Sequence, residues 1–250
     1  MANTREVTDM KSINDYCQQM TKKLLELAQT FARKSRRPST KLTCDDLINA
    51  LEFELIMTTK KCIYYMRHFE ALHNIPPCNF RIPDPELSPY GQTQAFAAIE
   101  TIKNIPSIDL IVCSPLTRTL ETSLLVFKNQ YPSPFIIHPD LQEVCTEPCD
   151  IGSSVDQLKI KFPSLSNELD MFTQTFGDTE WLDKMNPDNI YSPTRIKERV
   201  KRLLDWLLNR VEKHIFIISH GLMLKEFLYG GNDQKYNFKN GEIRTVEYAC

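Results

Sequence analysis

Long hydrophobic runs are missing from this 250-residue chain, and so is an excess of charge of either sign. No stretch of about 18 consecutive apolar residues occurs, so the sequence predicts no membrane-spanning helix. The first 30 residues lack an apolar stretch of signal-peptide length, which argues against secretion. Thirty Lys and Arg against 32 Asp and Glu give a net charge of −2, which excludes a strongly basic nucleic-acid coat protein and a strongly acidic tail protein.

Glycine is scarce and unevenly placed. All seven glycines lie at or after Gly91, and all five histidines lie between His68 and His220, so the first 60 residues hold neither. A length of 250 residues allows one large domain, or a smaller domain with an appendage. The asymmetry favours the second choice, with a helical extension over residues 1–60 and a larger domain over residues 61–250.

Paired cysteine motifs are also lacking. The eight cysteines are scattered, whereas disulfide frameworks belong to small secreted chains. Cys145 and Cys149 form a C-x3-C pair without a second pair that would complete a zinc site. The sequence therefore predicts no metal, no cofactor and a reducing compartment, which we expect to be the cytoplasm, with the nucleus as the alternative.

Short apolar runs alternate with longer segments of helical periodicity from residue 61 onward. Strands are predicted at 62–66, 110–113, 135–137, 214–218 and 243–248. Helices are predicted at 89–103, 117–128, 193–212 and 222–228, with short ones at 154–161 and 179–184. Continuous apolar strands that alternate with helices indicate an α/β fold with a mostly parallel sheet covered on both faces.

Polar residues follow four of these strands. Arg67 and His68 follow the first strand, Arg118 lies just beyond the second, Glu143 lies past the third, and His220 follows the fourth. Ligands of open parallel sheets bind outside the carboxyl ends of the strands. We therefore expect two arginines, two histidines and a carboxylate to meet at one edge of the sheet.

The chemistry of this set points to phosphoryl transfer. Arg67 and Arg118 offer the bidentate donors that suit phosphate, and a helix that begins near Thr117 would direct backbone N–H groups toward an anion. A histidine can act as the nucleophile, and a carboxylate can protonate the leaving group. The arginines would then neutralise the charge that Mg²⁺ neutralises in kinases, so no metal is needed.

Five segments also match a known family in the right order. R-H-F-E-x-x-x-N, which begins at Arg67, resembles the R-H-G-E-x-x-x-N signature of the histidine phosphatase (phosphoglycerate mutase-like) superfamily. The other segments lie at residues 87–95, 114–122, 141–143 and 219–221 and resemble its L-T-x-x-G-x-x-Q-A, S-P-L-x-R-A-x-Q-T, L-x-E and second-histidine motifs. Residues 61–250 are thus similar to that superfamily, and the resemblance implies a three-layer αβα phosphoglycerate mutase-like fold.

The resemblance also implies roles. His68 would form a phosphohistidine, and Glu143 would protonate the leaving oxygen and then activate water. The phosphoryl oxygens would be held by Arg67, Asn74, Arg118 and His220. The substrate would be a phosphorylated small molecule or a phosphoprotein, and the activity that of a phosphomonoester hydrolase.

The sequence departs from the family pattern at two positions, and it does not decide which carboxyl group is the general acid. Phe69 replaces the usual glycine after the histidine, which would be costly if that position required φ > 0. Glu121 replaces a common glutamine and adds a negative charge beside the predicted anion site. Glu147 and Asp150 remain rivals of Glu143 for the role of the acid.

The N-terminal segment supports a different hypothesis. Residues 12–53 resemble the long helix, loop and third helix of a histone fold, which buries its apolar face against a partner. A second function is therefore a protein-binding scaffold that docks a histone-fold-type partner through residues 12–53, with a weakly active or inactive phosphatase-like domain. A third possible function is that of a phosphoglycerate mutase. The composition argues against nucleic-acid and membrane partners.

Overall fold

The computed structural model describes residues 60–127, 131–231 and 236–249, together with Lys22, Glu26, Gln29 and Ile48, which are helical. One compact unit spans Lys61–Tyr248. Apart from these four residues, the segment 12–53 lies outside the described residues, and so does the resemblance to a histone fold that was predicted for it. Among the helices described, none is long and apolar enough to cross a membrane.

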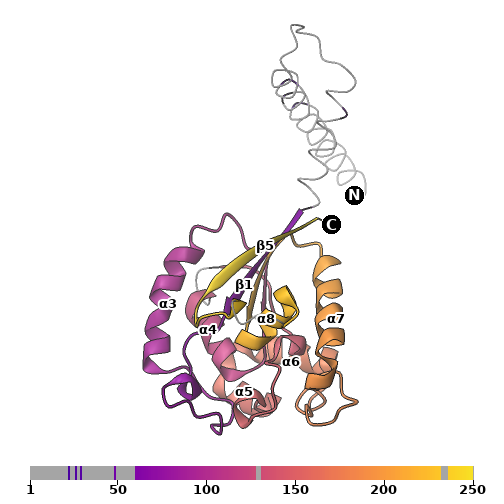
Figure 1. Ribbon diagram of the computed structural model, residues 1–250. Helices are drawn as coiled ribbons and strands as arrows, with labels where there is room; N and C mark the ends of the chain where they lie inside the picture. The colour runs from indigo at the N-terminus through magenta and orange to yellow at the C-terminus, as the bar shows by residue number, and fades with distance from the viewer. Residues whose placement is uncertain are drawn as a thin grey trace, which may run out of the picture. The chain divides into compact units, whose positions relative to one another are not determined.

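A five-stranded sheet forms the centre of this unit (Figure 1). Its strands are β1 (Lys60–Arg67), β2 (Leu110–Cys113), β3 (Phe135–Ile137), β4 (His214–Ser219) and β5 (Ile243–Ala249). They are arranged in the order β3-β2-β4-β1-β5, and the β1–β4, β2–β4 and β2–β3 pairs are all parallel. The mostly parallel sheet that the sequence predicts is confirmed.

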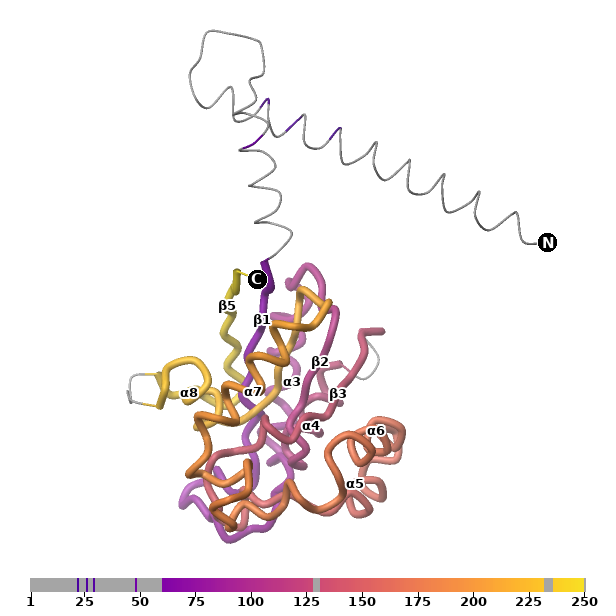
Figure 2. The backbone as a smooth tube through the Cα atoms, turned by 90° about the vertical axis from the view of Figure 1, so that its right-hand side faces the viewer, coloured from indigo at the N-terminus to yellow at the C-terminus, as the bar shows by residue number. Residues whose placement is uncertain are grey.

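Helices cover both faces of the sheet, because the central strands are apolar on both sides. Successive residues of β4 alternate between two cores: Phe216 and Ile218 face one, and Ile215 and Ile217 face the other. The first core is completed by α3 (Pro89–Ile102), α4 (Thr117–Phe127), α5 (Val155–Lys161) and α6 (Ser166–Phe176). The second is completed by α7 (Ile196–Leu208) and α8 (Gly221–Tyr229). Figure 2 shows the same unit turned by 90°, with α6 and α7 labelled.

One predicted helix is wrong, and one observed helix was not predicted. Residues 179–184 form turns instead of a helix, because this segment wraps around Trp181, whose side chain is fully buried and donates from Nε1 to the carbonyl of Asp178 at 3.1 Å. Helix α6 precedes it, and its apolar side is marked by Leu169 and Phe172, which are spaced three residues apart. That spacing was the available signal for the helix.

Candidate active site

The carboxyl ends of the parallel strands bring the predicted site residues together. Arg67 ends β1, His68 follows it, and His220 follows β4. The rings of His68 and His220 lie 5.2 Å apart between centroids. Arg118, in the first turn of α4, donates from Nε to Nε2 of His68 at 3.3 Å. These four residues therefore form one cluster at the edge of the sheet.

The contacts of His68 define its tautomer. Its Nδ1 lies 2.5 Å from the backbone carbonyl oxygen of Phe69, and a carbonyl oxygen can only accept a hydrogen bond. Nδ1 therefore carries the proton. Nε2 has a lone pair, which is consistent with the N–H that Arg118 directs at it. The unprotonated nitrogen of His68 thus faces the arginine side of the cluster.

Burial and positive charge keep both histidines neutral. His68 is 1 % exposed and His220 is fully buried. Burial is the largest cause that lowers the pKa of His68 well below its usual value, and the charges of Arg118 and Arg67 lower it further. Burial and Arg118 lower the pKa of His220 in the same way. Burial disfavours charge of either sign, whereas the nearby guanidinium charges of Arg67 and Arg118 favour an anion beside the histidines.

Each arginine is held by backbone carbonyls. Arg67 donates from one terminal nitrogen to the carbonyl of Phe238 at 2.7 Å, and its buried Nε has no partner among the described residues. Arg118 donates to the carbonyl of Cys149 at 2.5 Å and to Oδ1 of Asp150 at 3.1 Å. The two guanidinium groups are thereby fixed in place before any ligand binds.

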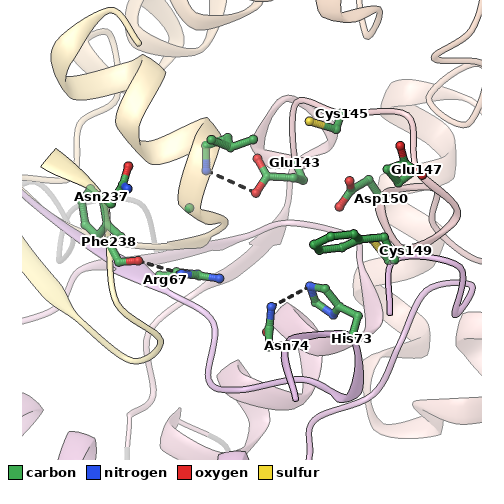
Figure 3. Close-up of a pocket in the computed structure, with 13 residues that line it drawn as sticks. Arg67, His73, Asn74, Glu143, Cys145, Glu147, Cys149, Asp150, Asn237 and Phe238 are labelled. Carbon is green, nitrogen blue, oxygen red and sulfur yellow. Dashed lines mark hydrogen bonds between the residues drawn. The ribbon is translucent and has the colours of Figure 1, made fainter. Parts of the chain in front are cut away.

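Glu143 lies at the N-terminus of α8. Its Oε1 accepts from the backbone N–H of Met223 at 2.9 Å, and its Oε2 accepts from that of Leu222 at 3.2 Å. The half-buried carboxyl group therefore lies beside the helix that follows His220 (Figure 3). Of its two rivals, Asp150 is paired with Arg118, and Glu147 is exposed.

The expected anion-binding role of the α4 N-terminus is not supported. The backbone N–H of Thr117 donates to Oδ1 of Asp84 at 2.9 Å, and its hydroxyl donates to Oδ2 at 2.8 Å. Ser153 adds two more hydrogen bonds to the same carboxylate. Asp84 is buried and already supplies the negative charge that a helix N-terminus attracts.

A cavity of about 440 Å³ opens beside this cluster. Arg67, Asn74 and Glu143 all line it, whereas His68, Arg118 and His220 are buried next to it. In Figure 3, Arg67 and Asn74 lie on one side of the cavity and Glu143 lies on the other, together with Glu147 and Asp150. The arrangement suits a ligand with an anionic end near the two arginines and an oxygen that can reach a carboxyl group.

The comparisons with known proteins agree with this geometry. The sequence profile of the histidine phosphatase superfamily (branch 1) matches residues 63–248. The chain belongs to this superfamily. A phosphatase-named protein of Schizosaccharomyces pombe is 27% identical over 173 residues, covering 67% of this chain and 77% of that protein. The phosphoglycerate mutase-like protein 1 of Arabidopsis thaliana is 25% identical over 233 residues, covering 74% and 80%.

A solved structure shares the fold of this member of the histidine phosphatase superfamily. A protein from Escherichia coli assigned as an alpha-ribazole-5'-P phosphatase superposes with a TM-score of 0.50 at 19% identity, covering 74% of this chain and 89% of that one. The predicted three-layer phosphoglycerate mutase-like fold is confirmed. Membership of the family makes the chain a phosphatase or mutase-like enzyme.

The two departures from the family pattern are accommodated. Phe69 does not have a positive φ, and its buried ring lies where a Cβ on Gly241 would come within 3.0 Å, so that glycine makes room for it. Glu121 accepts from the backbone N–H of Leu87 at 2.7 Å and has Lys161 3.9 Å away. Neither side chain lines the cavity at Arg67.

His73 is a cavity residue that the sequence analysis did not single out. The Oδ1 of Asn74 accepts from the backbone N–H of Ala71 at 3.1 Å, so its amide nitrogen faces Nε2 of His73, 3.0 Å away. The amide nitrogen can only donate, so Nε2 accepts and the proton of the neutral ring is on Nδ1. Burial lowers the pKa of His73 to about 3, and Nδ1 has no partner among the described residues.

Lys184 is a second residue that was not predicted. This lysine is 1 % exposed and donates to three backbone carbonyls, those of Glu143 at 2.7 Å, Cys145 at 2.5 Å and Asp150 at 3.0 Å. Burial lowers its pKa to about 8. Lys184 therefore holds together the segment that carries all three candidate acids. Among the described residues, no group of three or more His, Cys, Asp or Glu is placed to hold a metal ion.

Proposed function

We propose that the protein is a metal-independent phosphomonoester hydrolase that acts through a phosphohistidine on His68. The observation that carries the proposal is the lone pair of His68 Nε2, because the hydrogen bond from Nδ1 to Phe69 places the proton on the other ring nitrogen. That nitrogen lies within 3.3 Å of the Arg118 guanidinium. An unprotonated nucleophile beside a fixed positive charge is what attack on a phosphate anion requires.

The reaction has two balanced steps. Nε2 of His68 attacks phosphorus, the bond from phosphorus to the ester oxygen breaks, and that oxygen takes a proton from the Glu143 carboxyl group. Water then gives a proton to Glu143 and attacks phosphorus, and the bond from phosphorus to Nε2 breaks. Arg67, Arg118 and His220 donate hydrogen bonds to the phosphoryl oxygens, and this stabilises the charge of the transition state. Asn74 lines the same cavity and is a further contact in this proposal.

The decisive experiment measures the covalent intermediate. The protein, treated with EDTA, is mixed rapidly with 4-nitrophenyl phosphate and quenched in base, and its peptides are analysed by mass spectrometry. We expect hydrolysis to persist in EDTA, and we expect a phosphoryl group on the peptide that contains His68, lost on treatment with acid. Activity that disappears in EDTA and returns with Mg²⁺ would contradict metal independence. Phosphorylation of a different residue would contradict the assigned nucleophile.

Replacing Glu143 with glutamine should lower kcat by about 100-fold, the usual contribution of a general acid. The loss should be larger for 4-ethylphenyl phosphate than for 4-nitrophenyl phosphate, because nitrophenolate is the better leaving group and needs less protonation. The amide oxygen of the variant can still accept from the N-terminus of α8. The inhibition constant of inorganic phosphate should therefore change little.

Asp150→Asn is the matched variant, since Asp150 lines the same cavity and is also carried by the 143–150 segment. Its kcat loss should be similar for both esters, because its carboxylate positions Arg118 instead of the leaving oxygen. An unchanged rate in Glu143→Gln would move the acid role to Glu147 or Asp150.

A further inference from the structure

The cavity has two electrostatically different ends. Arg67 is the only positively charged side chain among the described residues that line it, and Arg118 is buried beneath the wall. Three carboxyl groups line the opposite side, those of Glu143, Glu147 and Asp150 (Figure 3). Among the lining residues the positive charge is thus at Arg67, while the buried Arg118 lies 3.1 Å from Asp150 on the carboxyl side.

His73 lies beside the proposed phosphoryl end of the cavity. The residue is 6 % exposed, lines the cavity, and carries its proton on Nδ1, for which no acceptor is found among the described residues. A buried donor without an acceptor costs free energy unless a ligand supplies one. The preference for an anionic group on this side of the cavity therefore comes from the positive charge of Arg67, which lines it.

The carboxylates on the other side are not equivalent. Glu143 accepts hydrogen bonds from the N-terminus of α8, and Asp150 accepts one from Arg118. The Glu147 side chain is exposed and has no hydrogen-bond or ion-pair partner among the described residues. Two carboxylates thus have partners within the protein, and the third presents an unpaired negative charge to whatever extends from the phosphoryl group.

Apolar side chains also line the cavity. Phe80 and Leu222 line the cavity and are 50 % and 46 % exposed, which is high for large apolar residues. Phe238 lines the cavity as well. Contact with a ligand would remove this apolar surface from water, which is favourable roughly in proportion to its area. The lining of the cavity therefore also suits a hydrocarbon or aromatic stem.

We propose, on the basis of the function proposed above, that the substrate is a phosphate monoester whose leaving group carries a positively charged amine on an apolar stem. The phosphoryl group would lie at Arg67, the stem would lie against Phe80 and Leu222, and the amine would lie near Glu147. A carboxylate or second phosphate at that position would face Glu147 without a compensating cation. The site therefore selects against phosphoglycerate and bisphosphorylated substrates, which disfavours the mutase hypothesis.

The test uses three phenyl phosphates that differ only in their 4-substituent: 2-aminoethyl, ethyl and 2-carboxyethyl. At low ionic strength, kcat/KM should fall in that order, with about a tenfold difference between the first and the last. Exposed ion pairs and like-charge contacts each contribute a few-fold at most. The same order should be found in dissociation constants measured by calorimetry on the full-length His68→Ala protein, which lacks the proposed nucleophile and does not consume the esters.

Charge variants assign the effect to a residue. Glu147→Gln should remove most of the difference between the charged esters, and Glu147→Lys should reverse it. Glu100→Gln removes the same charge from an exposed position on α3 and should leave the ratio unchanged. High ionic strength should reduce the ratio, because the carboxylate is exposed to solvent.

The outcomes separate the two proposals. If no ester is hydrolysed, the proposed function is wrong, and the dissociation constants alone then decide the selectivity. If all three esters are hydrolysed and bound equally, or if the Glu147 variants keep the wild-type order, the present inference is wrong and the phosphatase assignment is unaffected.

Discussion

Replacing His68 with alanine is expected to lower kcat on an aryl phosphate by about 10⁴-fold or more, the scale of loss seen when a nucleophile is removed. In the proposed mechanism the side chain supplies the only protein atom that forms a bond to phosphorus. It is also enclosed, because its Nδ1 bonds to the Phe69 carbonyl and its Nε2 accepts from Arg118. Steady-state hydrolysis of 4-nitrophenyl phosphate in EDTA measures the loss.

Loss of a buried ring also removes packing, so the fold must be checked in the same variant. Circular dichroism and thermal unfolding should show a folded protein, and inorganic phosphate should still bind through Arg67 and Arg118. The matched control is His214→Ala. His214 begins β4, at the opposite edge of the sheet from His220, so turnover should be retained. A folded His68→Ala protein with wild-type turnover would rule out the phosphohistidine mechanism.

The order of elements was predictable from sequence because the strands are continuous apolar runs. β2 and β3 were predicted with the bounds that the structure shows, and β4 differs by one residue. Such runs have few alternatives in a sheet that is covered on both faces. The segment 179–184 was harder, because its conformation depends on burying the Trp181 ring next to Gly152, where a Cβ would come within 2.6 Å of that ring. No local pattern encodes a contact between residues so far apart.

The site was also predictable only in part from the sequence. Parallel strands must bring Arg67, His68 and His220 to one edge, so their proximity follows from the topology. The contacts that fix the positions and protonation of the site's side chains do not follow from the topology. Lys184 holds carbonyls that lie 34 to 41 residues before it in the chain, and only the folded backbone reveals them. The donor on His73 likewise depends on which way the Asn74 amide faces.

Replacing Arg118 with methionine should lower kcat by about 10³-fold and should also change the pH dependence of the reaction. Arg118 is the charge nearest to the proposed nucleophile, and removing one fixed donor to a transition-state oxygen typically costs about this much. Its positive charge is also the second-largest cause, after burial, of the low pKa of His68. Without it that pKa rises, so more of the nucleophile is protonated at a given acidic pH. The acidic limb of kcat/KM should therefore move to higher pH.

Arg118→Lys separates charge from geometry. Lysine keeps the positive charge but cannot reach His68, Cys149 and Asp150 together as the planar guanidinium does. Its kcat should therefore fall, while the acidic limb stays close to that of the wild-type enzyme. The two variants are compared through pH profiles of kcat/KM, with phosphate inhibition measured in parallel. An acidic limb that is identical in wild type, Arg118→Met and Arg118→Lys would show that the limb does not report His68, and the assignment of that nitrogen as the nucleophile would lose its electrostatic support.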